Sequence, residues 1–523
     1  MRLLAKWFNL FILILLASCG KQSEVALRLN VGSDPHTLDP RAARDLQSIT
    51  ITRMFFEGLT RVNPEEKAEL AAAKQVEVSD DGKVYTFYLR EARWSSGEAV
   101  TAHDFAYAWS KVLDPLFPAD QAFQLYVVKN GRACKEGKVG FDQVGVKVLD
   151  ARTLQVELEY PIPYFLEQVA LPVYFPVSKK ADEKNGRWFQ QKETFVSNGP
   201  FTIGEWKHMS RLTAVKNPTY WDAAHVQLGK IELVMVSEEL ELKMYERGEL
   251  DWAGSPLGLL PLESLKELKK RGTLHVRPFL ATYFFRTNAE AEPFENPLMR
   301  RAFALALKRT DIVQHVTQGE QIPATGLIPP ALGVQKEPYF QDGDEEEARK
   351  LFAEALRIDG KAEAPSVSLL YVAGERSHLI AQAVQEQWRR VLGVTVELQA
   401  VERKVFFDRT SKRNFQLAVG SWTADYGDSM NFLEIFKFKG SGSNNTAWEH
   451  PRYRQLLDLA LEAKDPEQRT ELFRECETIL MQEMPIIPLF HYTLLYVAKD
   501  EVKGVALSSL GGLDFKWASV ERR

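Results

Sequence analysis

The histidines and cysteines of this chain are not spaced for metal or nucleophilic chemistry. No two of the nine histidines are four positions apart, the spacing that places two imidazoles on one helix face. The sequence has no Cys-x-x-Cys, no Gly-x-Ser-x-Gly and no Gly-x-x-x-x-Gly-Lys. Residues 440–444, Gly-Ser-Gly-Ser-Asn, lack the lysine of a phosphate loop, so we interpret them as a flexible loop. A binding protein is therefore favoured over an enzyme, and no cofactor is expected.

The segment 421–426, Ser-Trp-Thr-Ala-Asp-Tyr, stands at a position where a ligand would bind. From residue 366 onward, apolar periodicity predicts alternating strands and helices, at 367–371, 378–391, 394–398, 402–411 and 415–419. This βαβαβ order predicts a parallel sheet covered by helices, and thus an α/β fold. Ligands of such sheets bind beyond the carboxyl ends of the strands, which is where this segment follows.

Other segments carry clear secondary-structure patterns. Alternation predicts a strand over 26–31 and a pair of strands within 74–90 that turn at Asp81-Gly82. Thr101, followed three residues later by Asp104, predicts the start of a helix. Further patterns predict a helix over 45–58, paired strands over 144–149 and 153–158, and a helix over 299–318.

Length and composition limit the class of protein. With 523 residues, 45% of them hydrophobic, the chain is too long for one core, and two or three domains are expected. Charged residues make up 26% with both signs mixed and a net charge of −5, which argues against nucleic-acid binding. Past the N-terminus no apolar run reaches the about 18 residues of a membrane span.

Residues 1–18 have the features of a signal peptide. Arg2 and Lys6 precede an apolar run over 7–17, too short for the about 20 residues that span a membrane. The run ends in Leu-Ala-Ser-Cys, which resembles a bacterial lipobox, whose cysteine receives lipid and becomes the new N-terminus. Because two or more acyl chains anchor a protein stably, Cys19 is expected to carry a membrane anchor that includes palmitate. The alternative is an ordinary signal peptide with an accidental cysteine.

Two other cysteines remain, Cys134 and Cys476. In an oxidising compartment they can form one disulfide, and two buried free thiols are the alternative. Their spacing alone does not decide between the two.

Ten motifs carry a resemblance to a known family. The most specific lie within 83–105: Lys-Val-Tyr-Thr-Phe-Tyr-Leu-Arg, Trp-Ser-Ser-Gly-Glu and Val-Thr-Ala-His-Asp-Phe. The others lie at 31–40, 197–201, 217–221, 248–251, 296–302, 422–426 and 484–488. In this order, from about residue 28 to 505, they resemble the family-5 extracytoplasmic solute-binding proteins, and within them the oligopeptide-binding branch.

The resemblance implies a two-lobed periplasmic-binding-protein type II fold, of the Venus-flytrap kind, with an inserted third β-rich domain. The expected divisions are a signal peptide at 1–18, lobe I at 19–57, 186–283 and 497–523, the inserted domain at 58–185, and lobe II at 284–496. In the family the two lobes close over the ligand about a hinge.

The resemblance also implies where a peptide would bind. Asp425 matches the aspartate that binds the peptide α-ammonium, and a turn cap or a partner of a nearby cation is the alternative role. Trp422 would form a flat wall beside the peptide unless it belongs to the core, and Thr423 would offer backbone contacts. Tyr283 lines the cleft or is a core aromatic. Arg44 stands where close relatives have a glutamate, which suggests a preference for acidic side chains or simply a solvated arginine.

Recognition of the peptide carboxylate departs from the family pattern. The positions that hold the family's arginine and histidine are Thr410 and Ser377 here, and Arg409 and His378 are each one residue away. One residue turns a helical side chain by about 100°, so equivalence of Arg409 and His378 is open. The motif's arginine just before the tryptophan segment is replaced by Val419. Peptide length preference is open for the same reason.

We therefore expect a monomeric, lipid-anchored, extracytoplasmic protein of the bacterial cell membrane. It would capture short peptides and deliver them to the permease and ATPase subunits of an ABC importer. The alternative within the fold is another solute: a dipeptide, a cell-wall peptide, a nickel complex, haem or a sugar. A hydrolase, a chaperone and a structural surface lipoprotein are further alternatives that no residue supports.

Overall fold

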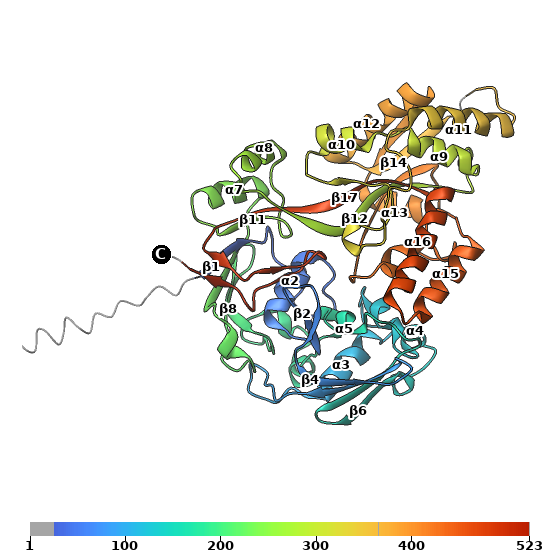
Figure 1. Cartoon of the computed structure of the whole chain (residues 1–523). Helices are drawn as coiled ribbons and strands as arrows, with labels where there is room; N and C mark the ends of the chain where they lie inside the picture. Colours follow the sequence, from blue (N-terminus) through green and yellow to red (C-terminus); the bar gives the residue numbers. More distant parts are fainter. Residues whose placement is uncertain (1–25, 364–365, 522–523) are drawn as a thin grey trace, which may run out of the picture.

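The computed structural model describes residues 26–363 and 366–521, so that Cys19 and the expected signal peptide lie outside the described residues. Figure 1 shows two parts of the molecule joined by two long strands that lie side by side, β12 (His275–Thr287) and β17 (Ile486–Ala498). The expected lobe divisions after residues 283 and 496 fall inside these two strands.

A four-stranded sheet organises the first part. Its strands are β1 (Ala26–Asn30), β8 (Phe201–Lys207), β9 (Arg211–Lys216) and β10 (Lys230–Val234), in the order β1-β10-β9-β8. β1 runs parallel to β10, although about 200 residues of chain lie between them. Helix α2 (Leu46–Phe55) lies beside this sheet, begins at Asp45, whose carboxylate accepts the Ser48 N–H at 2.8 Å, and buries Ile51 and Phe55. The predicted strand over 26–31 is thereby confirmed. The helix predicted over 45–58 is present but ends at Phe55, because Phe56 has an extended backbone.

A second four-stranded sheet lies within residues 58–185. It is antiparallel, in the order β4 (Ala73–Val78), β5 (Val84–Leu89), β7 (Thr153–Glu157), β6 (Val146–Asp150). Helix α3 (Ala102–Val112) covers it and begins as predicted, with Asp104 accepting the Thr101 N–H at 2.8 Å. Shorter elements complete this region: β2 (Thr60–Val62), β3 (Ala68–Leu70), η1 (Ala122–Val127), α4 (Gly131–Lys135), α5 (Phe165–Gln168), η3 (Pro172–Tyr174) and α6 (Lys179–Lys184).

The largest sheet extends through both parts. Its order is β11 (Trp252–Gly254), β17, β12, β16 (Leu417–Thr423), β14 (Val367–Val372), β15 (Val396–Val401), with β13 (Ile322–Pro323) on β17. β14 pairs in parallel with both β15 and β16, which confirms the parallel arrangement predicted for the βαβαβ run. The intervening helices are α12 (Glu375–Leu392) and α13 (Arg403–Ser411).

Other helices surround the sheets. In the second part they are α9 (Pro297–Leu305), α10 (Arg309–Ile312), α11 (Glu345–Ile358), α14 (Met430–Leu433), α15 (Pro451–Glu462) and α16 (Pro466–Glu483); α7 (Glu238–Glu246) and α8 (Leu262–Lys270) lie beside β11. No helix among the described residues is long and apolar enough to cross a membrane.

Three local predictions need correction. The helix predicted over 299–318 is interrupted after α9, because the buried Arg309 guanidinium donates to the Ala304 and Leu307 carbonyls and Asp342 accepts the Arg309 N–H at 2.9 Å. The strands predicted at 394–398 and 415–419 instead run over β15 and β16. β16 extends to Thr423 because β12 continues to pair with it, from Thr287 opposite Leu417 to Ala281 opposite Thr423.

The two described cysteines are free and buried. Cys134 is in α4 and Cys476 is in α16. Of the two alternatives left open by the sequence, the structure selects free thiols.

Candidate functional site

Asp425 lies two residues past the carboxyl end of β16. Asn431, on α14, positions this segment: its side-chain oxygen accepts the Asp425 backbone N–H at 3.2 Å and the Trp422 indole N–H at 2.8 Å. The Asp425 side chain is half-buried, and burial raises its pKa to about 6, against the opposing effect of hydrogen bonds with Asn431 and Gln124. No lysine, arginine or histidine among the described residues forms an ion pair with Asp425. A cation from a ligand would therefore meet an unneutralised carboxylate.

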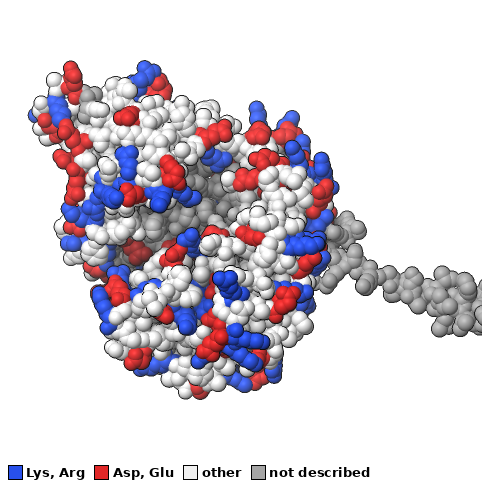
Figure 2. Space-filling model, turned by 180° about the vertical axis from the view of Figure 1, so that it is seen from behind, with Lys and Arg blue, Asp and Glu red and all other residues white. Residues whose placement is uncertain are grey.

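Two cavities meet at Asp425 and Gln124. The first has a volume of about 370 Å³ and is lined from α2, η1, η3, the end of β16 and the segment 510–512. The second, of about 440 Å³, is lined from η1, α5, α14 and residues 437–443. Each cavity thus takes its walls from both parts of the molecule. Figure 2 shows the molecule hollowed between its two halves, with charged side chains of both signs around the hollow.

Four of the residues expected to contact a ligand line these cavities. Arg44 and Thr423 line the first cavity and Trp422 lines the second, while Asp425 belongs to both. Arg44 is exposed and pairs with Asp120, which is exposed to a similar degree. Arg44 therefore has an ion-pair partner within the protein, although solvent screens this exposed pair.

The other three expected residues lie elsewhere. Tyr283 is buried in β12, where its ring stacks on Phe490 with centroids 4.9 Å apart, so it packs as a core aromatic. Arg409 donates to the Gln399 side chain at 3.0 Å and to the Asn414 carbonyl at 3.1 Å. The His378 ring nitrogen lies 2.6 Å from the Tyr371 hydroxyl. None of the three lines either cavity at Asp425.

The second cavity has an aromatic wall that the sequence did not indicate. Phe123, Tyr160 and Phe438 line it and are 46%, 40% and 50% exposed. Large aromatic side chains are expensive to leave in water, and these three come from distant segments to one concave surface. Charged side chains such as Arg132, Glu434 and Lys437 line the same cavity, so it offers a ligand apolar surface beside polar groups.

A stacked aromatic pair forms part of the lining of the second cavity. Tyr426 and Tyr164 are both buried and stack with ring centroids 4.2 Å apart. The Tyr426 hydroxyl donates to Glu434 at 2.9 Å. This pair connects the segment after β16 with residue 164, just before α5, so it bridges two regions that line the cavity.

Sequence reasoning missed several residues at this site. Gln124, Tyr164 and Arg53 belong to no recognisable motif, and only folding brings them to Asp425. Asn431 offered a weak signal, since it follows Asp425 by six residues. No group of three or more histidine, cysteine, aspartate or glutamate side chains in the described chain is arranged to hold a metal.

Comparison with known proteins agrees with a two-part molecule that holds a ligand in its cleft. The model of the bacterial extracellular solute-binding proteins, family 5, matches residues 67–444. The oligopeptide-binding protein OppA of Bacillus subtilis is 41% identical over 95% of this chain and 92% of its own length. The dipeptide-binding protein DppE of the same organism is 36% identical over the same shares. The solved structure of the murein tripeptide-binding protein MppA, unliganded and open, has a TM-score of 0.81 at 28% identity, covering 95% of this chain and 98% of that one.

The fold and the cleft are those of a solute-binding protein. This chain belongs to the bacterial extracellular solute-binding proteins of family 5. Family membership confirms the resemblance, the two-lobed α/β fold class and the assignment to a binding protein rather than an enzyme.

Proposed function

We propose that this protein is the peptide-binding component of an ABC importer. The observation that carries the proposal is Asp425: a half-buried carboxylate without a cationic partner in the described chain, at the meeting point of two cavities. A peptide α-ammonium supplies the missing charge, and a charge-assisted hydrogen bond is favoured where water is scarce. The relatives named for oligopeptide and dipeptide binding support the same ligand class.

The edge of β16 supports an extended peptide. β14 pairs with β16 only at Leu417 and Ala418, whereas β16 continues to Thr423. Among the described residues, the edge of β16 over 419–423 that faces away from β12 therefore has no strand partner. The Val419 carbonyl accepts an Arg286 guanidinium N–H at 2.8 Å. The backbone of 420–423 on this edge would pair with a peptide main chain, which gives affinity without regard to side chains. Trp422 and Thr423, which are the expected peptide contacts, belong to this stretch of β16.

Transport requires further steps outside this chain. We propose that lobe I (19–57, 186–283 and 497–523), the inserted domain (58–185) and lobe II (284–496) close over the peptide, and that the closed form is presented to separate permease and ATPase subunits. Lipid on Cys19 would keep the monomer at the extracytoplasmic face of the membrane. Arg409 and His378 stay candidates for the peptide carboxylate only if closure brings them to the cleft.

The second candidate function is the binding of another solute in the same cleft. A murein tripeptide-binding protein of similar structure favours a cell-wall peptide over a nickel complex or haem, because such a peptide also suits the two cavities at Asp425. A ligand with a free amine satisfies Asp425 in either case.

The ligand that copurifies with the protein tests the proposal. The mature protein is purified under native conditions, its ligand is released by denaturation, and the low-mass fraction is identified by mass spectrometry. Mixed short peptides are the expected result, and muropeptides alone would establish the second candidate. A metal chelate or haem as the only ligand would overturn the assignment to peptides.

A further inference from the structure

An arginine that sequence reasoning did not single out lies in the cavity with Asp425. Arg53 is in the last turn of α2 and lines the first cavity. It is partly buried, and burial lowers the pKa of its guanidinium from the usual value. Gly512 lines the same cavity, and a methyl group at Gly512 would overlap the Arg53 guanidinium, so the glycine leaves the room that this side chain occupies.

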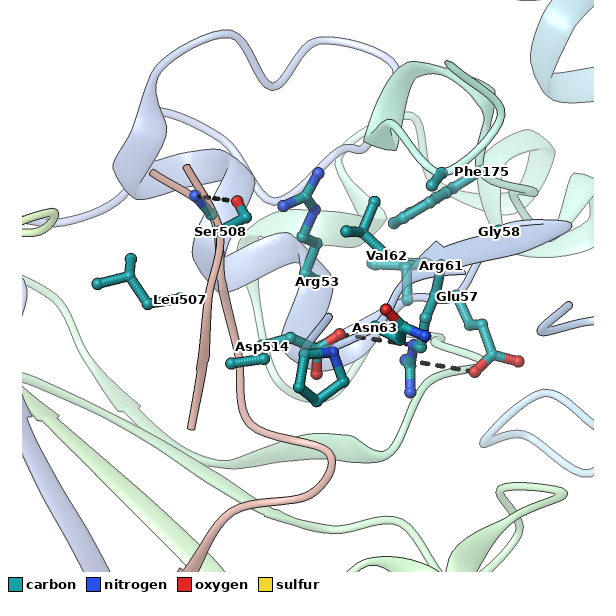
Figure 3. Close-up of a pocket in the computed structure, with 15 residues that line it drawn as sticks. Arg53, Glu57, Gly58, Arg61, Val62, Asn63, Phe175, Leu507, Ser508 and Asp514 are labelled. Carbon is teal, nitrogen blue, oxygen red and sulfur yellow. Dashed lines mark hydrogen bonds and ion pairs between the residues drawn. The ribbon is translucent and has the colours of Figure 1, made fainter. Parts of the chain in front are cut away.

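Arg53 lacks the partners that its neighbour has. Arg61 contacts Glu57 at 3.3 Å and Asp514 at 3.5 Å, and Figure 3 shows both contacts as dashed lines. The guanidinium of Arg53 points away from them, and it forms no hydrogen bond or ion pair with any described residue. Asp514 attracts Arg53 only from a distance. The Asp514 carboxylate instead pairs with Arg61 and accepts the Lys516 backbone N–H at 2.9 Å.

An unpaired guanidinium in a cleft indicates an anionic partner. Removing a cation from water is costly unless an anion or several acceptors replace the lost hydration. The other arginine of this cavity, Arg44, already has Asp120 as its partner. The first cavity thus contains one carboxylate, Asp425, and one guanidinium, Arg53, that both lack an ion-pair partner among the described residues.

We propose that Arg53 binds a carboxylate of the ligand in the cavity where Asp425 binds its amine. The inference rests on the proposed function. A guanidinium presents parallel N–H donors that match both oxygens of a carboxylate, so the contact would be bidentate and specific. The carboxylate is either the peptide C-terminus or an acidic side chain, and both present the same chemistry. A ligand that places both an amine and a carboxylate in this cavity would contact both residues together.

Four tripeptide probes and four forms of the protein test this inference by titration calorimetry after removal of endogenous ligand. Ala-Ala-Ala and its C-terminal amide differ in the terminal carboxylate, and Ala-Glu-Ala-amide and Ala-Gln-Ala-amide differ in the side-chain carboxylate. The proteins are wild type, Arg53→Gln, Arg53→Lys and Arg389→Gln. Arg389 is an exposed residue of α12 that pairs with Glu386, so its substitution controls for net charge.

In at least one of the two peptide pairs, the wild type should bind the peptide with the carboxylate at least about tenfold more tightly than the matching amide. The reason is that hydrogen bonds to charged groups are stronger than those between neutral groups. Arg53→Gln should abolish that preference and leave the affinity for the neutral peptide within about threefold. Arg53→Lys should retain part of the preference, since lysine keeps the positive charge but lacks the two parallel N–H donors of a guanidinium. A preference within the Ala-Ala-Ala pair identifies the peptide C-terminus as the bound carboxylate, and a preference within the Ala-Glu-Ala-amide pair identifies an acidic side chain.

An unchanged acid preference in Arg53→Gln would overturn the inference. The same holds if the wild type binds these peptides without any acid preference, although the proposed function would then stand. Failure of the wild type to bind any short peptide would instead overturn the proposed function. Thermal unfolding monitors the fold of each variant, and if Arg53→Gln does not fold, the comparison of Arg53→Lys with wild type decides.

Discussion

At the scale of single residues, the site depends on which charges the protein leaves unpaired. The family resemblance suggests Arg44 as a ligand contact, yet Arg44 forms an exposed ion pair with Asp120. Asp425 and Arg53 share the cavity and lack ion-pair partners among the described residues. The proposed peptide ligand would supply both opposite charges, an ammonium for Asp425 and a carboxylate for Arg53.

Replacement of Asp425 by asparagine should remove the preference for a free amine. The variant keeps the shape of the side chain and loses its charge, so binding of Ala-Ala-Ala should weaken by about 10- to 100-fold. N-acetyl-Ala-Ala-Ala, which has no ammonium, should change far less. Calorimetry of both peptides measures the effect, and an equal loss for both would contradict the assigned role of Asp425.

The same carboxylate should make binding depend on pH. With a pKa of about 6 in the unliganded protein, Asp425 is charged at pH 7 and mostly protonated at pH 5. Peptide affinity should therefore fall by about tenfold from pH 7 to pH 5, because each unit below the pKa costs that factor. Burial also raises the pKa of the nearby Glu434 carboxyl, so Asp425→Asn serves as the control and should lose most of the pH dependence.

The stability of the unliganded protein should respond to Asp425 in the opposite sense. A carboxyl whose pKa is raised by folding takes up a proton between its unfolded pKa, about 4, and its folded pKa, about 6. Its unfavourable contribution is therefore present above pH 6 and is relieved as the pH falls through that window.

At the scale of elements, the carboxyl end of β16 is held from two sides. Asn431 on α14 fixes the backbone of Asp425 and the indole of Trp422. On the other side, Tyr426 stacks on Tyr164 from the segment before α5. Stacking of buried rings adds stability beyond their burial, so this pair couples the segment after β16 to the segment before α5.

A double-mutant cycle at Tyr164 and Tyr426 should reveal this coupling. Each single change to alanine should destabilise the protein by about 3–5 kcal/mol, as removal of large buried rings does. The double variant should be less destabilised than the sum by about 1 kcal/mol, the contribution of the ring contact itself. Urea unfolding measures all four proteins, and strict additivity would show that the two rings are independent.

At the scale of the whole molecule, β12 and β17 connect the two parts. The cleft lies between the two parts, where the two cavities are lined from both. Pairing of β1 with β10, and of β17 with β11, returns distant parts of the chain to the first part. Because each cavity takes its walls from both parts, a relative movement of the two parts would open or close the site. Membership of the solute-binding family is consistent with such a movement.

Membrane attachment should depend on Cys19 alone among the three cysteines. Cys19→Ser in the full chain should move the protein from the membrane fraction to the soluble extracytoplasmic fraction, because the thiol that would receive lipid is lost. Fractionation with immunodetection measures the distribution. Cys134→Ala, at a buried free thiol, is the matched control and should stay with the membrane. Retention of Cys19→Ser on the membrane would contradict a lipid anchor at this residue.

Local sequence was sufficient to predict the elements in which buried and exposed residues alternate with a regular period. The strands around the Asp81-Gly82 turn, the capped helix that begins after Thr101 and the βαβαβ order all follow from side chains a few residues apart. The position of Asp425 beyond a strand end followed from the same order. These features depend on short-range periodicity and turn chemistry, which a sequence displays directly.

Contacts between distant segments decided the rest. The helix predicted over 299–318 is interrupted because Asp342 caps Arg309, and β16 reaches Thr423 because β12 pairs with it. Whether an arginine is free for a ligand was likewise invisible in the sequence. Arg44 and Arg53 are nine residues apart in one segment. Only the folded chain brings Asp120 to Arg44, and places Arg53 in the same cavity as Asp425 without an ion-pair partner among the described residues. Charge balance in a cleft is set by groups far apart in sequence, so the tertiary structure alone determines it.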